Sequence, residues 1–150
     1  MKKEDVFKLF GIDDLRDLPD AVTKIIEGDL NDRNDVYKEL IRLNNYDMSH
    51  DWFQELYESE LSERKQKKQD FTPNSLGILC SELTGQHGHL HEPTAGNGSM
   101  IIADWWQRCN KLIPWEHFPS QHMVTCWELS SRSIPILLLN LSIRVSRGRA

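Results

Sequence analysis

Residues 92–100, with the sequence EPTAGNGSM, constrain the fold of this chain more than any other segment. They connect a short strand candidate, residues 89–92, to an apolar segment with the length of a helix, residues 100–109. Gly96 and Gly98 have no Cβ, so the backbone can turn sharply there and a ligand can approach it closely. In α/β proteins such a turn lies at the carboxyl ends of the strands, where ligands bind. The segment therefore predicts a ligand-binding turn in a parallel sheet.

These two glycines do not match the common phosphate-binding loops. The sequence GNG lacks the third glycine of the dinucleotide fingerprint GxGxxG, and no Gly-Lys-Ser or Gly-Lys-Thr follows it. A tight turn with only a structural role is therefore the alternative to a ligand site.

A second strand and helix are expected after this turn. Residues 123–129 are a strand candidate, residues 131–143 are a helix candidate, and a loop marked by Pro114 and Pro119 precedes them. Strand, glycine turn, helix, loop, strand and helix follow one another as in the βαβ units of a doubly wound parallel sheet. The predicted fold class of residues 71–150 is therefore α/β.

Residues 1–62 are expected to form an all-helical N-terminal segment. One helix starts at Pro19 and ends at Gly28, and an amphipathic helix covers residues 32–44. Ser49 is the expected N-cap of a third helix. Its apolar side chains are expected in the core: Trp52, Phe53, Leu56, Tyr57 and Leu61.

A polar run, residues 63–70, is the expected linker between this segment and residues 71–150. After the extended tripeptide Phe-Thr-Pro, Asn74 or Ser75 is expected to cap a helix that ends at Gly85.

The net charge of −5 is unevenly distributed along the chain. Residues 1–61 contain 16 acidic and 8 basic side chains, net −8, whereas residues 62–150 contain 7 acidic and 10 basic ones, net +3. The acidic half is a poor candidate for contacting DNA phosphates. Two basic clusters are interpreted as solvated surface rather than as nucleic-acid sites: Arg64, Lys65, Lys67 and Lys68, and Arg144, Arg147 and Arg149.

Neither a metal site nor a disulfide framework is predicted. The three cysteines are widely spaced and form no CxxC pair, which favours small buried thiols. His87, His89 and His91 share one face of an extended segment but lack the nearby Cys, Asp or Glu ligands of a metal site.

The composition is that of an ordinary globular protein, with 39% hydrophobic and 27% charged residues. No apolar run approaches the roughly 20 residues that cross a bilayer. The N-terminus also lacks the apolar stretch of a signal peptide. We therefore expect a cytoplasmic protein without membrane contacts.

Glu128 is the acidic residue that accompanies the glycine turn. It stands at the end of the second predicted strand, where a carboxylate can accept hydrogen bonds from both ribose hydroxyls of a nucleoside cofactor. A surface charge without such a role is the alternative.

Three segments together resemble a known family. QDFTPNSLGILCSEL, HEPTAGNGSMI and CWELSSRSIPILLLNLSIR are similar, in order, to the leading, glycine and ribose-binding motifs of N6-adenine DNA methyltransferases, in particular the modification subunit of type I restriction systems. The resemblance covers about half of the chain. It implies a partial Rossmann-like sheet, S-adenosylmethionine as the cofactor, and methylation of the adenine amine after the base is flipped out.

The resemblance also implies a role for each matching residue. Three residues would line the methionine end of the cofactor: Phe71, Thr72 and Pro73. Glu92 would approach the methionine ammonium group, and the turn beneath the cofactor would be formed by Ala95, Gly96 and Gly98. Glu128 would hold the ribose, and Leu129 would pack on the adenine. For Thr72, a helix cap is the alternative.

The family's amine-binding motif, Asn-Pro-Pro-Phe or Asn-Pro-Pro-Tyr, does not occur in this sequence. We therefore predict no catalytic residues and expect a truncated cofactor-binding fragment that is inactive alone. A homodimer or hetero-complex is expected because a partial sheet has open edges, with DNA reached only through a larger assembly.

Two other functions remain open. One is a non-catalytic binding protein, for example one encoded by a mobile element, that inhibits or regulates a nuclease or restriction-modification complex. The other is a complete small methyltransferase with another substrate, for which the sequence offers no catalytic base.

Overall fold

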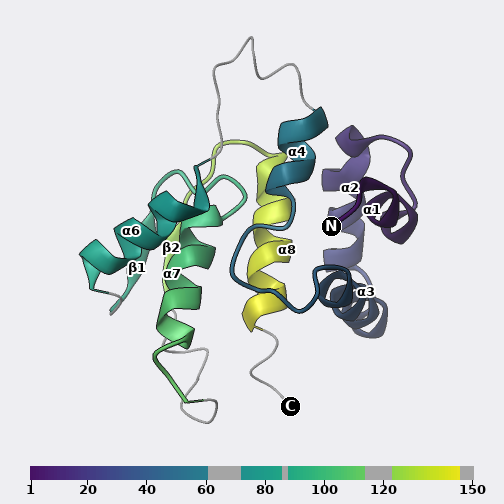
Figure 1. Ribbon diagram of the computed structural model, residues 1–150. Coiled ribbons are helices and arrows are strands. Elements are labelled where there is room, and N and C mark those ends of the chain that lie inside the picture. Colours follow the sequence, from purple (N-terminus) through teal and green to yellow (C-terminus); the bar gives the residue numbers. More distant parts are fainter. Residues whose placement is uncertain (61–71, 86–87, 114–122, 146–150) are drawn as a thin grey trace.

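The computed structural model describes residues 1–60, 72–85, 88–113 and 123–145. Within these ranges the chain is mostly helical, with seven α-helices, one 3-10 helix and a two-stranded parallel sheet (Figure 1). None of these helices is both long enough and apolar enough to span a membrane. Three predicted features lie outside the described residues: the linker 63–70, the core position of Leu61, and the loop between Pro114 and Pro119.

Four α-helices and the 3-10 helix form the N-terminal part. Their bounds are α1 Lys3–Phe10, η1 Leu15–Asp17, α2 Leu18–Glu27, α3 Leu30–Leu43 and α4 Gln54–Glu60. The predicted end of α2 at Gly28 is confirmed. Helix α1 is not among the predicted helices. It ends at Gly11, whose φ of 63° lets the chain leave the helix in the left-handed conformation.

The predicted cap of the third helix, Ser49, is wrong, because α4 begins only at Gln54. The Asp51 carboxylate accepts a hydrogen bond from the Phe53 N–H (3.0 Å) and so stabilises a turn ahead of the helix. Trp52 and Phe53 therefore precede α4, although they are buried as predicted.

The predicted order of strand, helix, strand and helix is confirmed in the C-terminal part. The bounds are α6 Asn74–Thr84, β1 Leu90–Glu92, α7 Ser99–Cys109, β2 Val124–Cys126 and α8 Ser133–Val145. Strands β1 and β2 pair in parallel, with Glu92 opposite Cys126. The chain therefore leaves both strands at the same edge of the sheet.

Two predicted boundaries in this part are wrong. Strand β2 ends at Cys126, so Glu128 lies in the loop that follows the strand. Neither Asn74 nor Ser75 caps α6. No described side chain accepts a capping hydrogen bond from the first turn of the helix, and the N-cap position is occupied by Pro73. Its extended backbone (φ −58°, ψ 141°) provides the change of direction that a capping residue normally makes.

Helix α8 lies between the sheet and the N-terminal helices (Figure 1). Three of its side chains are fully buried in one cluster with the core of the N-terminal helices: Ile136, Leu139 and Ile143. On its other side, Leu137 packs with Ala95 and Ile101. The N-terminal helices thus cover a surface of α8 that a two-stranded sheet leaves uncovered.

Helices α6 and α7 approach each other most closely at Gly77, where an added Cβ would lie 2.7 Å from the Cβ of Ala103. We expect Gly77→Ala to lower the free energy of unfolding by about 1–3 kcal/mol, although alanine is the better helix former. The double variant with Ala103→Gly has the methyl group on α6 and none on α7, so it should recover most of the lost free energy of unfolding. Urea denaturation of the wild type and of these two variants measures the effect, and equal losses of stability in the single and double variants would contradict the contact.

Candidate functional site

The glycine turn, residues 93–98, leaves β1 and enters α7. Gly96 and Gly98 have positive φ angles of 55° and 97°, which favour glycine. Gly98 N–H donates to the carbonyl of Ala95 (2.8 Å), and Ala95 N–H donates to the carbonyl of Trp127 (2.9 Å). A Cβ on residue 96 would meet no described atom within 4 Å. The turn is therefore tied to the loop after β2 and has open space beside Gly96.

Glu128 connects the two loops through its carboxylate. Oε2 accepts a hydrogen bond from Gly96 N–H (2.6 Å), and Oε1 accepts one from Ser130 N–H (2.7 Å). Each carboxylate oxygen has two acceptor positions, so both oxygens can accept one more hydrogen bond. The residue predicted to hold a ribose thus lies beside the glycine turn, half-buried and held in one orientation.

Glu92 ends β1 and shapes the start of the turn. Its Oε1 accepts hydrogen bonds from the N–H and the hydroxyl of Thr94 (3.0 and 3.1 Å). Its carbonyl accepts one from Trp127 N–H (2.9 Å). The predicted contact with an ammonium group would use the remaining acceptor positions of this half-buried carboxylate.

Thr72 and Pro73 lead into α6, and Phe71 lies outside the described residues. Thr72 does not occupy the N-cap position of α6, because Pro73 does. Residues farther along α6 contact residues farther along α7. Gly77 faces Met100 and Ala103, and Ser81 Oγ donates to Asp104 Oδ1 (2.9 Å). The start of α6 therefore lies toward the start of α7, where the glycine turn ends.

Two further features border the turn. Leu129 is fully exposed, and Trp127 is 65% exposed. Helix α7 begins at Ser99, and no described side chain caps its first turn. Its first amide N–H groups and the positive end of the helix dipole are therefore directed toward the end of the glycine turn.

A buried polar network behind the glycine turn was missed by sequence reasoning. Asn140 Nδ2 donates to Asp51 Oδ1 and to the carbonyl of Asn97, both at 2.9 Å. Burial raises the pKa of the Asp51 carboxyl, and the hydrogen bonds from Phe53 N–H and the Asn140 amide oppose this shift. The one signal in the sequence is an asparagine within the apolar run ILLLNL.

The interpretation of Arg144 as solvated surface is wrong. This side chain is 2% exposed. It donates to three backbone carbonyls: Met48 (3.2 Å), His50 (2.6 Å) and Asn140 (2.8 Å). Burial lowers the pKa of its guanidinium to about 10. Arg147 and Arg149 lie outside the described residues, as does the basic cluster at residues 64–68.

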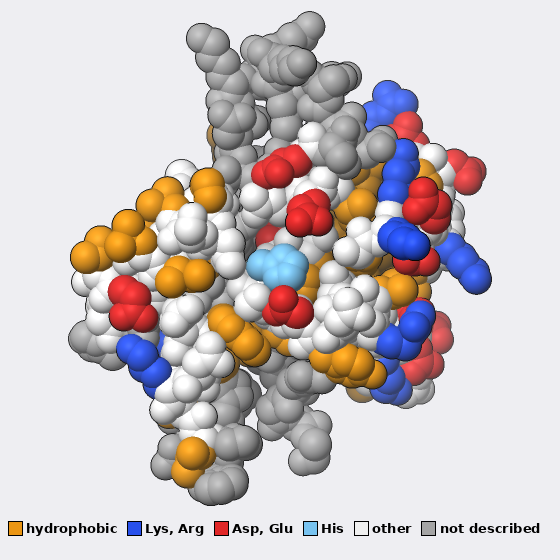
Figure 2. All heavy atoms as spheres, in the orientation of Figure 1, with side chains coloured by type: hydrophobic (Ala, Val, Ile, Leu, Met, Phe, Trp, Pro, Cys, Tyr) orange, Lys and Arg blue, Asp and Glu red, His pale blue; other side chains and the backbone are white. Residues whose placement is uncertain are grey.

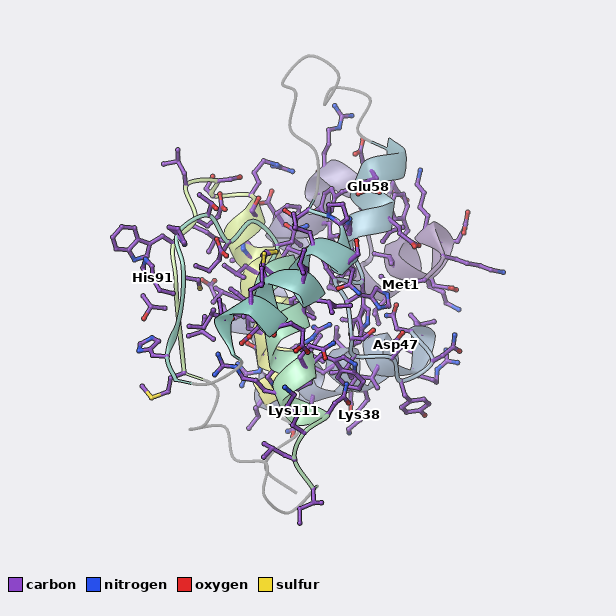
Figure 3. The ribbon with its side chains drawn as sticks, turned by 60° about the vertical axis from the view of Figure 1, so that its left-hand side comes forward. Met1, Lys38, Asp47, Glu58, His91 and Lys111 are labelled. Carbon is purple, nitrogen blue, oxygen red and sulfur yellow. The ribbon has the colours of Figure 1, made fainter. Side chains whose placement is uncertain are left out.

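Polar and aromatic side chains occupy the outer face of the sheet. His91 lies on the side of β1 turned away from the helices (Figure 3). Its ring lies edge-on to that of Trp127, with 5.5 Å between the ring centroids. His89 Nε2 lies 2.8 Å from Thr125 Oγ1, and His87 is outside the described residues. Across the described ranges, no group of three or more His, Cys, Asp or Glu side chains is placed to hold a metal ion.

The chain matches no protein-family model, no curated protein and no solved structure. The functional interpretation therefore depends on the site's own geometry and on the three sequence motifs. Of the predicted site residues, that geometry joins Ala95, Gly96, Gly98 and Glu128 in one hydrogen-bonded unit, with Glu92 at its entrance.

Proposed function

We propose that this chain binds S-adenosylmethionine at the glycine turn, as the cofactor-binding part of an adenine-N6 DNA methyltransferase with a Rossmann-like fold. The supporting observation is the 2.6 Å hydrogen bond from Gly96 N–H to Glu128 Oε2, between residues 32 positions apart. It joins the turn after β1 to the acidic residue after β2. Both lie at the carboxyl ends of paired parallel strands, where nucleoside cofactors bind in open α/β sheets.

The residues around the turn fit the different groups of this cofactor. The remaining acceptor positions of Glu128 suit two ribose hydroxyls, and Glu92 suits an ammonium group. The start of α7 suits the carboxylate of the methionine part. Leu129, fully exposed, offers apolar surface to an adenine ring. An acceptor pair, an anion-binding helix end and an apolar side chain thus border the same turn.

Transfer of a methyl group to DNA needs additional residues. The adenine amine must donate its hydrogens to protein acceptors while the flipped base is held in place. In the family that the motifs resemble, an Asn-Pro-Pro-Phe or Asn-Pro-Pro-Tyr segment does this, and these 150 residues contain neither an Asn-Pro nor a Pro-Pro dipeptide. We therefore expect cofactor binding without methylation by this chain alone.

Calorimetry with S-adenosylmethionine tests the site, and we expect saturable binding with a micromolar Kd. Glu128→Ala removes the ribose acceptor, and Gly96→Trp fills the open space beside the turn. Glu128→Ala should weaken binding by about 100-fold, because two hydrogen bonds to a charged group are lost. Gly96→Trp should weaken binding to a similar degree, because the indole ring takes the space that the cofactor would occupy.

Gly11→Trp is the matched control for Gly96→Trp. Gly11 also has a positive φ (63°) and no described atom within 4 Å of an added Cβ, but it lies at the end of α1. This variant should bind as the wild type does.

Two results would contradict the proposal. If the wild type shows no binding at millimolar S-adenosylmethionine, a non-catalytic protein that regulates a nuclease or restriction-modification complex becomes the better interpretation. If the isolated chain transfers a labelled methyl group to DNA, the expected lack of turnover is wrong.

We also propose that the chain acts in a homodimer or hetero-complex, through which it reaches DNA. Within the described residues, β1 and β2 pair only with each other, so each strand has one edge that pairs with no described strand and that another chain can extend. Helix α6 adds an exposed apolar surface (Figure 2): Leu76 (45%), Leu79 (53%) and Leu83 (78%). Such a surface is typical of a contact with another chain.

A further inference from the structure

Buried hydrogen bonds connect the segment between α3 and α4 to the glycine turn. The amide nitrogen of Asn140 donates one hydrogen to Asp51 Oδ1 and the other to the carbonyl of Asn97, both at 2.9 Å. Asp51 belongs to the N-terminal part, whereas Asn97 stands between the two glycines of the turn. One side chain of α8 thus links two segments that are 46 residues apart in the sequence (97 − 51).

The orientation of the Asn140 amide follows from its neighbours. Arg144 Nη1 lies 3.4 Å from Asn140 Oδ1 and also donates to the Asn140 carbonyl (2.8 Å). Because arginine only donates, the amide oxygen faces Arg144 and the amide nitrogen faces Asp51 and Asn97. Asn140, Asp51 and Asn97 are 0%, 2% and 7% exposed, so bulk water does not replace a broken bond.

The bond to Asn97 acts on the part of the site that contains the two glycines with positive φ angles. Gly96 and Gly98 allow more backbone conformations than other residues, so the turn needs contacts that select one of them. Packing alone does not require an asparagine at position 140, because fully buried apolar side chains surround it along α8, among them Ile136, Leu139 and Ile143. An apolar residue there would leave the Asn97 carbonyl and the Asp51 carboxylate without this donor.

We propose that Asp51, acting through Asn140, is a positioning residue for the glycine turn, so that the N-terminal part of the chain influences the affinity of the cofactor site. The part that concerns affinity rests on the proposed function. The part that concerns the conformation of the turn does not.

Nuclear magnetic resonance of the full chain without cofactor tests the conformation of the turn. In the wild type the amides of Gly96 and Gly98 are hydrogen-bonded to Glu128 and Ala95. Asp51→Ala, or the milder Asn140→Ser if the first variant does not fold, should raise the hydrogen-exchange rates of both amides by about tenfold. Asp51→Asn keeps an acceptor for Asn140 and should stay within about twofold of the wild type.

Calorimetry tests the affinity of the same variants. Asp51→Ala should weaken S-adenosylmethionine binding by about three- to tenfold, the usual net effect of one intramolecular hydrogen bond. The double variant Asp51→Ala with Asn140→Ser should lose no more affinity than the single variant that binds more weakly, because both changes break the same connection.

Ser81→Ala is the matched control, because it removes another buried hydrogen bond between side chains, from Ser81 Oγ to Asp104 Oδ1 (2.9 Å). It should leave the glycine amides and the affinity unchanged. Equal effects of Asp51→Ala and Ser81→Ala, or no effect of Asp51→Ala, would overturn the positioning role. If the wild type binds no S-adenosylmethionine, the proposed function fails, and the exchange of the glycine amides alone decides the role of Asp51.

Discussion

Replacing Gly98 with alanine should lower the free energy of unfolding by about 2–4 kcal/mol, a large loss for a single methyl group. Gly98 has a φ of 97°, and a residue with a Cβ is strained in the left-handed region by about 1–2 kcal/mol. The added Cβ would also lie 2.9 Å from Leu137 Cδ1, within a buried cluster, and overpacking of this kind costs about 1–3 kcal/mol.

Gly96→Ala separates the two causes of this loss. Gly96 also has a positive φ, 55°, but no described atom lies within 4 Å of an added Cβ. This variant should lose only about 1 kcal/mol. Urea denaturation followed by tryptophan fluorescence measures both variants. Equal losses at the two positions would contradict the close contact between residue 98 and Leu137.

Replacing Arg144 with alanine should lower the free energy of unfolding by about 3–5 kcal/mol. The guanidinium is 2% exposed and donates to the carbonyls of Met48 and His50. Alanine would leave these carbonyls without their donor, at a cost of about 1–3 kcal/mol each. It would also remove the contact between the guanidinium and the rings of Trp52 and Trp105, at 5.0 and 5.9 Å.

Arg144→Lys and Arg42→Ala are the controls for this prediction. Lysine keeps the positive charge but lacks the planar group that reaches several acceptors at once, so it should restore less than half of the loss. Arg42 pairs with Glu39 on the exposed surface of α3, and its replacement by alanine should change the stability little. A urea midpoint for Arg144→Ala equal to that of the wild type would contradict the buried role of Arg144.

The arrangement of residues 89–109 could be predicted from the sequence because its signals are local. A short strand, two glycines and an apolar run follow one another, and each element depends mainly on its own residues. The same holds for the ends of α2 and α6, where Gly28 and Gly85 follow the last helical residues.

The start of α4 and the end of β2 could not be predicted in this way. Asp51 and Glu128 bond nearby backbone N–H groups, those of Phe53 and Ser130, and these bonds favour turns where the periodicity predicts helix or strand. Periodicity does not indicate whether Ser49 or Asp51 makes such a bond, and it is Asp51 that does. The predicted cap Ser49 was wrong for this reason.

The sequence by itself determined the order of the elements around the glycine turn, and it identified Gly96, Gly98 and Glu128 as a candidate site. Only the tertiary structure decided that Glu128 bonds the turn through Gly96 N–H, and that Asn140 and Arg144 are buried. The reason is that turn and helix preferences arise within a few residues. The environment of a polar side chain depends instead on segments distant in the sequence, as residues 51 and 97 are from Asn140.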